Sequence, residues 1–397
     1  MSGNKNILLL TSLYPCDDIK ILNNTSVCHY FAKEWLKMGY QVRVIFNYNV
    51  YPVVYYPFLR LLRKKMANVF GVSIQDVYVK EPYRYEKDGI IIDRLPIYKA
   101  KPRGRSTNEE IARQYNQIVS ILDTDGYKPN MVLGHFTHPN LELVVKLKEH
   151  YSAVSTITLH GAETDYSESD AHLFEAVDYV GFRSYPAKWA FEKIYGEKPF
   201  FMCPSGVPEQ RITKPRVFTR TVSNFIYVGT FMKRKFPSSL LPAISNVYGS
   251  EDFTITYIGD GEDKRQIVSK AKDYKCLDKI VFTGRIPRDK IFEHLDKSDV
   301  FIMISKKETF GLVYLEAMAR GCIVVASKNE GMDGIVENGV NGFLCEAGNE
   351  KELEQIVRQI KGMTVEHLSK MSEESIKTAR KFTDFNVAKE YIESIDK

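Results

Sequence analysis

Two carboxylates, Glu308 and Glu316, stand eight positions apart in the last third of the chain. The residues between them, around 310–313, are expected to begin a helix, whose first N–H groups lack partners within the helix and attract anions. Eight helical residues cover ~12 Å, and a carboxylate can accept two hydrogen bonds from a vicinal diol. The spacing suits a ligand with a hydroxylated group at each end and phosphate between, as in a nucleotide sugar. The alternative is that Glu308 caps the helix and Glu316 is a solvated charge.

Regular elements on both sides must position these carboxylates. Residues 299–304 form a short apolar run typical of a buried parallel strand, and residues 305–309 are polar and predict a loop. Residues 310–320 have helical spacing, and Gly321 ends that pattern. Residues 323–326 predict the next buried strand. The segment is therefore expected to be one strand–loop–helix–strand unit of a doubly wound α/β domain.

Composition places the chain among ordinary globular proteins, with 44% hydrophobic and 26% charged residues in 397. The net charge of +5 is mild and does not indicate a nucleic-acid binder. The six cysteines are scattered without a C-x-x-C pair, which fits a reducing, cytoplasmic compartment. No apolar stretch reaches the ~18 residues that a bilayer requires. We expect neither a membrane span nor a signal peptide, and at most peripheral contact with the inner face of a membrane.

The N-terminal residues predict a Rossmann-like opening, with a strand at 6–11, a helix at 27–38 and a strand at 41–46. No G-x-G-x-x-G is present. Asn24 and Thr25 stand in the loop just before the helix. Taken alone, this loop predicts N-capping of the helix by Thr25 or Ser26.

Two histidine-bearing loops follow neighbouring strands of the predicted sheet. His135 and His138 follow the strand that begins near residue 129, and His160 follows the strand at 153–159. Ligands of open α/β sheets bind at the carboxyl ends of the strands, where these loops are expected to lie. A metal site is disfavoured, because the H-x-x-H spacing is loose and no Cys or further His completes a set. As a lone residue, His160 would be a structural histidine. Glu163 and Asp165, which follow it, are candidates for the acceptor side or for helix caps.

Residues 51–70, YPVVYYPFLRLLRKKMANVF, place aromatic residues and leucines beside the cations Arg60, Arg63, Lys64 and Lys65. An apolar face next to a basic face suits peripheral contact with an anionic membrane surface. The alternative is a helix that packs on its own domain and exposes its basic side to water.

A cluster of cations follows the strand predicted at 224–229. It comprises Lys233, Arg234 and Lys235, which come directly after Gly229 and Thr230. Charges beside a buried strand need partners, so the cluster indicates an anion site. Arg285 and Ile286 follow another predicted strand, at 280–284.

Residues 308–327, E-T-F-G-L-V-Y-L-E-A-M-A-R-G-C-I-V-V-A-S, closely resemble the E-x7-E motif of retaining GT-B glycosyltransferases of family 4. This family belongs to the glycosyl transferases group 1, and the resemblance is to the bacterial polysaccharide biosynthesis type. Residues 229–235 resemble its G-R-L-x-x-x-K segment, and His160-Gly161 resembles its H-G motif. Residues 284–287 resemble its nucleobase-reading turn. The resemblance covers nearly the whole chain and is specific over 225–345.

The resemblance implies an α/β chain with two Rossmann-like, doubly wound domains that face each other across a cleft. The acceptor-side domain would be 1–206 and the nucleotide-sugar-binding domain 207–380, with a helix in 381–397 that returns to the first domain. It also implies retaining transfer of a hexosyl unit from a UDP- or GDP-linked nucleotide diphosphate sugar. The acceptor would be a saccharide or a lipid-linked molecule in cell-surface polysaccharide synthesis. Neither a metal nor another cofactor is required in this family, because lysines and helix N–H groups neutralise the leaving diphosphate.

Individual roles follow from the same resemblance. Glu308, His160 and Lys235 would be catalytic, with His160 facing the donor sugar and Lys235 clamping the diphosphate. The implied donor-binding residues are Glu316, Thr309, Phe310, Gly311, Leu312, Thr230, Arg234, Lys235, Gly229, Arg285, Ile286, Asn24 and Thr25.

Two departures from the family pattern leave rival functions open. Thr230 occupies the position of the family's Arg, whose charge Lys233 or Arg234 can supply, and the loop around Asn24 lacks the usual Gly pair. One rival is a sugar-nucleotide 2-epimerase on the same fold. The other is a non-catalytic partner subunit, against which the intact Glu308, Glu316 and Lys235 argue.

Overall fold

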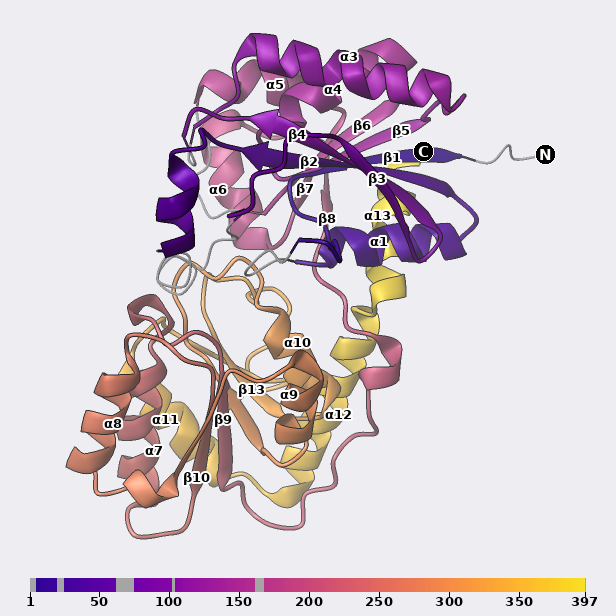
Figure 1. The fold of residues 1–397 in the computed structure, drawn as a ribbon. Helices are drawn as coiled ribbons and strands as arrows, with labels where there is room; N and C mark the ends of the chain where they lie inside the picture. The colour runs from indigo at the N-terminus through magenta and orange to yellow at the C-terminus, as the bar shows by residue number, and fades with distance from the viewer. Residues whose placement is uncertain (1–4, 20–24, 62–74, 102–103, 161–167, 397) are drawn as a thin grey trace. The chain divides into compact units, whose positions relative to one another are not determined.

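The computed structural model describes residues 5–19, 25–61, 75–101, 104–160 and 168–396 (Figure 1). Its contacts divide the chain into two compact units. Unit 1 comprises Met1–Arg183, Ala187–Cys203 and Val387–Lys397, and unit 2 comprises Ser184–Pro186 and Pro204–Asn386. The sequence-based division placed the corresponding limits at residues 206 and 380.

Unit 1 is built on an eight-stranded sheet in the order β3-β4-β2-β1-β5-β6-β7-β8. Neighbouring strands pair in parallel except β3 and β4, which are antiparallel. The inner strands are near-continuous apolar runs, as expected for parallel strands covered on both faces. The bounds are β1 Asn6–Thr11, β2 Gln41–Val50, β3 Tyr83–Lys87, β4 Ile90–Tyr98, β5 Met131–His135, β6 Val154–Leu159, β7 Tyr179–Phe182 and β8 Phe200–Met202.

Helices cover both faces of this sheet. Figure 1 shows α3 (Asn108–Thr124), α4 (Asn140–Tyr151) and α5 (Ala171–Ala176) on one face. It shows α1 (Val27–Lys37) and α13 (Asp384–Ile395) on the other. A further helix, α6 (Tyr185–Tyr195), joins β7 to β8.

The last helix packs into the core of unit 1. The indole N–H of Trp35 donates to the Ala388 carbonyl at 2.9 Å, and Tyr391 stacks on Phe201 with ring centroids 4.2 Å apart. The Tyr391 hydroxyl lies 2.8 Å from Oγ1 of Thr156. The expectation of a C-terminal helix that returns to the first domain is therefore confirmed.

Unit 2 contains a parallel sheet in the order β11-β10-β9-β12-β13-β14. Its strands are β9 Asn224–Val228, β10 Thr254–Ile258, β11 Ile280–Gly284, β12 Val300–Ile302, β13 Ile323–Ser327 and β14 Phe343–Cys345. Its helices are α7 Leu240–Tyr248, α8 Lys264–Asp273, α9 Arg288–Leu295, α10 Leu312–Ala319, α11 Glu350–Lys361 and α12 Val365–Lys381. Both units are thus mixed α/β with mostly parallel sheets, as the predicted fold class requires.

Several predicted boundaries were wrong by a few residues. Helix α11 begins at Glu350, because Asn349 accepts the Glu352 N–H as its N-cap. The helix expected at 310–320 spans Leu312–Ala319. The short elements β3, β14, α5 and α8 were missed. Among the described residues, no helix is both long and apolar enough to cross a membrane.

Candidate functional site

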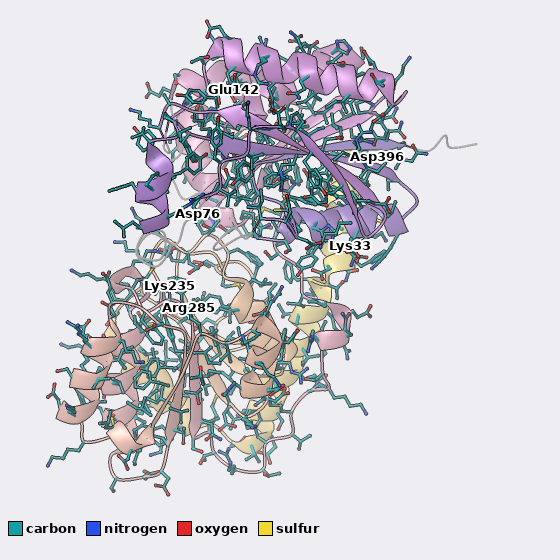
Figure 2. The ribbon with its side chains drawn as sticks, in the orientation of Figure 1. Lys33, Asp76, Glu142, Lys235, Arg285 and Asp396 are labelled. Atoms are coloured by element: carbon teal, nitrogen blue, oxygen red, sulfur yellow. The ribbon has the colours of Figure 1, made fainter. Side chains whose placement is uncertain are left out.

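A cation and a carboxylate meet at the carboxyl edge of the sheet in unit 2. Lys235 Nζ lies 3.1 Å from Oε2 of Glu308, and both side chains are largely buried, with exposed fractions of 16% and 15%. The Ser305 hydroxyl also donates to Oε2 of Glu308, at 3.3 Å. Lys235 and Arg285 both lie at this edge (Figure 2). Lys235 follows β9 and Glu308 follows β12, which are adjacent in the sheet, so the strand order brings them together.

Arg234 joins the same two loops. Its Nη1 donates to the carbonyls of Lys306 and Lys307, both at 3.2 Å, and its own carbonyl accepts the Lys306 N–H at 2.7 Å. In this structure the guanidinium therefore positions the loop that carries Glu308. Its implied contact with the donor stays a prediction.

A third carboxylate, Glu330, supports Glu308 from the loop after β13. Its Oε2 accepts the Glu308 N–H at 2.8 Å, and the Gly331 N–H donates to the Glu308 carbonyl at 2.9 Å. Burial raises the pKa of Glu330, and the nearby Glu308 charge raises it further. Sequence reasoning missed this residue. The available signal was an acidic residue and a glycine just after a buried strand.

The start of α10 is uncapped by any side chain. Its N-cap is Gly311 at φ 82°, and no side-chain hydrogen bond reaches its first turn. A Cβ on Gly311 would lie 2.6 Å from the Tyr314 ring, so the position requires glycine for space as well as for φ. The alternative in which Glu308 caps the helix is therefore wrong. The N–H groups at the start of α10, around Leu312, remain suited to an anion.

Glu316 is buried within α10, with only 3% of its surface exposed. Arg288, the first residue of α9, donates from Nε to its Oε1 at 2.5 Å. Burial raises the pKa of Glu316, and the charge and hydrogen bond of Arg288 partly oppose this. The alternative of a solvated surface charge is wrong. The sequence pattern also gave no sign that Arg288 would be the partner.

Glycines allow the loops after β9 and β10 to pack backbone against backbone. A Cβ on Gly259, which has φ +135°, would lie 1.9 Å from the Gly229 carbonyl oxygen. A Cβ on Gly261 would lie 2.2 Å from that of Phe231. The chain around Gly229 and Thr230 is thus held from one side, and the Thr230 carbonyl accepts the Tyr227 hydroxyl at 3.2 Å.

Two more of the implied donor-binding residues, Arg285 and Ile286, follow β11 and Gly284. Arg285 is exposed and Ile286 is half-buried. Their implied contact with the nucleobase stays a prediction.

In unit 1, two of the three candidate histidines meet. His135 Nδ1 lies 2.9 Å from His160 Nε2. His138 lies apart from this pair, between Oε1 of Glu142 at 2.7 Å and Oδ2 of Asp170 at 3.2 Å. Among the described residues no group of three or more His, Cys, Asp or Glu side chains could hold a metal ion.

The loop before α1 is described only in part. The Thr25 hydroxyl accepts the Val27 N–H at 3.3 Å, whereas Ser26, the N-cap, makes no side-chain cap bond. Asn24, Gly161, Glu163 and Asp165 lie outside the described residues.

Only residues 51–61 of the candidate membrane segment are described, and residues 55–61 are helical. Tyr51, Tyr56 and Leu59 pack together, and Arg60 Nε donates to the Asp76 carbonyl at 3.3 Å. The exposed apolar side chains of this stretch are Val53, Val54, Phe58 and Leu61.

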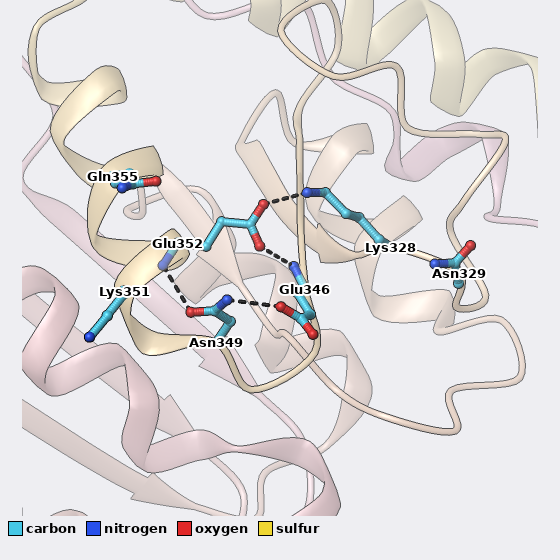
Figure 3. A pocket seen from close by; sticks show the side chains of 7 residues that line it. All are labelled: Lys328, Asn329, Glu346, Asn349, Lys351, Glu352 and Gln355. Carbon is cyan, nitrogen blue, oxygen red and sulfur yellow. Dashed lines mark hydrogen bonds and ion pairs between the residues drawn. The ribbon is translucent and has the colours of Figure 1, made fainter.

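A polar hollow lies on the surface of unit 2 between the ends of β13 and β14 and the start of α11 (Figure 3). Lys328 and Glu352 form an ion pair across it, and Glu352 also accepts the Glu346 N–H at 2.7 Å. Neither Glu308, Glu316 nor Lys235 lines it. Because the hollow contains neither motif carboxylate, we place the candidate site at the Lys235–Glu308 pair instead.

Comparisons with known proteins show similarity to glycosyltransferases. Residues 210–381 match the family model of the glycosyl transferases group 1. The N-acetyl-alpha-D-glucosaminyl L-malate synthase of Bacillus anthracis is 32% identical over 124 residues, which are 31% of this chain and 32% of that protein. An uncharacterized glycosyltransferase of Methanocaldococcus jannaschii is 24% identical over 333 residues, 78% of this chain and 87% of the relative. The chain thus spans about a third of the first relative and most of the second.

A solved structure extends the likeness to the whole fold. The Anabaena protein Alr3699/HepE, in complex with UDP-glucose, superposes with a TM-score of 0.65 at 16% identity, covering 99% of this chain and 100% of that one. It is a GT-B glycosyltransferase. Residues 210–381 thus match the glycosyl transferases group 1, and the whole chain has the GT-B architecture.

Proposed function

We propose that the chain transfers a hexosyl unit, with retention of configuration, from a nucleotide diphosphate sugar to a saccharide or lipid-linked acceptor. The observation that carries this proposal is the Lys235–Glu308 pair beside the uncapped start of α10. These groups offer one cation and free N–H groups to a diphosphate, and one carboxylate to sugar hydroxyls. The complex of Anabaena HepE with UDP-glucose supports a nucleotide sugar as donor.

The ion pair also indicates how the donor would enter. An ammonium group has three N–H donors, so Lys235 can bind a phosphate oxygen while it keeps or exchanges its bond to Glu308. Glu316, at the other end of the first two turns of α10, would accept the ribose diol, and Arg288 would hold its carboxylate in place. The leaving phosphate would act as the base for the acceptor hydroxyl, so no further protein base is required.

We further propose that the acceptor is met at a membrane surface in cell-surface polysaccharide synthesis. The exposed side chains of Val53, Val54, Phe58 and Leu61 support this proposal, since such residues insert at lipid interfaces. The contact would be peripheral.

A panel of nucleotides tests the donor class. UDP, UDP-glucose, UDP-N-acetylglucosamine and GDP-mannose would be added singly to the full chain, and the thermal unfolding midpoint would be measured. A ligand that binds the folded state raises the midpoint through RT ln(1 + [L]/Kd). We expect at least one of these four nucleotides to do so, and failure of all four would overturn the proposal. Conversion of the bound donor into a new nucleotide sugar without acceptor would instead identify an epimerase.

A further inference from the structure

The two contacting histidines of unit 1 form a buried pair with a defined surrounding. His135, the last residue of β5, is 0% exposed, and His160 follows β6, the neighbouring strand. The His160 ring stacks on Phe136 with centroids 4.1 Å apart. His135 is enclosed by the rings of Phe31 and Tyr391, at 5.7 and 5.9 Å. His160 as a whole residue is half-buried.

Burial and the nearby charge of Arg183 keep both rings neutral. Burial lowers the pKa of His135 to about 3, and the cation of Arg183 acts in the same direction. Burial likewise lowers the pKa of His160 well below its ordinary value, and Arg183 and His135 lower it further. Arg183, at the end of β7, donates to the Cys203 carbonyl at 2.8 Å. Burial raises the pKa of the Cys28 and Cys203 thiols, so these neighbours are neutral as well.

The hydrogen bond between these two neutral rings has one proton, which is carried either by His160 Nε2 or by His135 Nδ1. If His160 Nε2 carries the proton, His135 accepts at Nδ1 and must carry its own proton on Nε2. If His135 Nδ1 carries it, His135 Nε2 keeps a lone pair and His160 must carry its proton on Nδ1. His135 Nε2 is buried and has no hydrogen-bond partner among the described residues. A buried N–H without a partner is the rarer arrangement in proteins. The positive charge of Arg183 also favours a lone pair there over another proton.

We propose that His135 is a positioning residue whose Nδ1–H donates a hydrogen bond to His160 Nε2, so that His160 presents an Nδ1–H donor to a hydroxyl or ring oxygen of the donor sugar. The ligand in this statement rests on the proposed function, whereas the tautomer does not. In this form His160 can donate a hydrogen bond to the sugar but cannot take a proton from the acceptor.

Nitrogen-15 NMR of the unliganded full chain, labelled at histidine, tests the tautomer directly. Two-bond proton–nitrogen correlations distinguish a protonated from a bare ring nitrogen, and His135→Phe and His160→Asn assign the signals. We expect protonated Nδ1 and bare Nε2 on both rings from pH 6 to 8. A protonated Nε2 on His160, or an imidazolium on either ring at pH 7, would overturn the proposal.

His135→Phe keeps a ring but removes the donor. We expect His160 then to shift toward the Nε2-protonated form. The matched control is His150→Phe in the same unit, since His150 contacts the Tyr115 hydroxyl at 2.8 Å instead. This control should leave the His160 signals unchanged. If His135→Phe does not fold, the wild-type spectrum still shows which ring nitrogens of the two histidines are protonated.

Kinetics with UDP-glucose, or whichever donor the nucleotide panel identifies, add a second measurement. An Asn amide reaches the place of Nδ1 and a Gln amide that of Nε2. His160→Asn should therefore retain roughly tenfold more kcat than His160→Gln. The reverse order would contradict the proposed donor. If no nucleotide sugar binds at all, the proposed function fails while the NMR result stands on its own.

Discussion

Lys235 and Glu308 form a largely buried ion pair of 3.1 Å between the loops that follow β9 and β12. Each charge compensates the other before a ligand arrives, which lowers the cost of burying either one. A diphosphate brings a stronger anion to the same ammonium group. The pair is therefore suited to exchange partners on binding, and this leads to the first prediction.

Lys235→Ala is expected to weaken UDP binding by about 1.5–3 kcal/mol, because a charge-assisted hydrogen bond to phosphate is lost. The intact donor should lose a similar amount. Isothermal titration calorimetry with UDP and UDP-glucose measures both. Lys272→Ala is the control, since Lys272 lies on α8 and is exposed. Equal UDP affinity in Lys235→Ala and wild type would remove Lys235 from the site.

The two motif carboxylates should separate in their effects. Glu316→Ala is expected to reduce donor affinity by ~1.5–3 kcal/mol through loss of the ribose contact. Glu308→Gln keeps the shape of the side chain but not its charge, so it should mainly slow transfer and leave Kd close to that of wild type. Donor titration and single-turnover transfer distinguish the two. Unchanged donor affinity in Glu316→Ala would contradict its assignment to ribose.

Donor binding should weaken on acidification before an ordinary glutamate would protonate. Burial raises the pKa of Glu316 above 4.5, and a protonated carboxyl can no longer accept from both ribose hydroxyls. Acidification affects the folding stability in the opposite direction: protonation of Glu316 stabilises the folded protein although it weakens donor binding. Because the folded-state pKa is the higher one, this contribution is present below about pH 4.5 and is lost as pH rises through the raised pKa.

UDP titrations at a series of pH values check this prediction. Glu316→Gln is the control, since it retains Glu330, whose pKa is also raised by burial. The decline in affinity should be smaller in Glu316→Gln than in wild type. An identical pH dependence in both proteins would assign it to another group.

Gly331→Ala should destabilise the site that holds Glu308. The added Cβ would lie 2.5 Å from Cα of Phe310, so a backbone must move, at a cost of about 1–3 kcal/mol. Gly362→Ala is the control, because its Cβ would meet no atom closer than 3.5 Å and its φ of −82° suits alanine. Denaturant titration should show a loss of stability for the first variant only.

The membrane proposal predicts salt-sensitive vesicle binding. Replacing Arg60, Arg63, Lys64 and Lys65 with Gln should lower sedimentation with anionic vesicles, since each cation contributes ~1 kcal/mol near such a surface. Binding of UDP should be retained.

A control variant loses the same number of positive charges at another place. In it, Gln replaces four exposed cations of α12: Lys370, Lys377, Arg380 and Lys381. It should bind vesicles as wild type does. Absence of wild-type binding at low salt would favour an ordinary packed helix in 51–70 and a soluble acceptor.

Local pattern was enough to predict most of the regular elements. The strand at Asn6–Thr11 has the predicted bounds, since apolar runs bounded by polar residues depend only on neighbouring positions. The edge strand β3 was missed because its sequence, YRYEK, is charged and exposed. A strand at the edge of a sheet is partly exposed to water and buries little apolar surface. It therefore lacks the continuous apolar run by which buried strands are predicted.

The sequence by itself determined that Glu308 and Glu316 flank the start of one helix, because their separation is set by the rise of that helix. Only the tertiary structure decided their partners. Lys235, Arg288 and Glu330 come from three other segments, and the order of the parallel strands determines which segments meet at the edge of the sheet. Burial of Glu316 and the contact between His135 and His160 arise in the same way, since packing between distant segments leaves no mark in the local pattern.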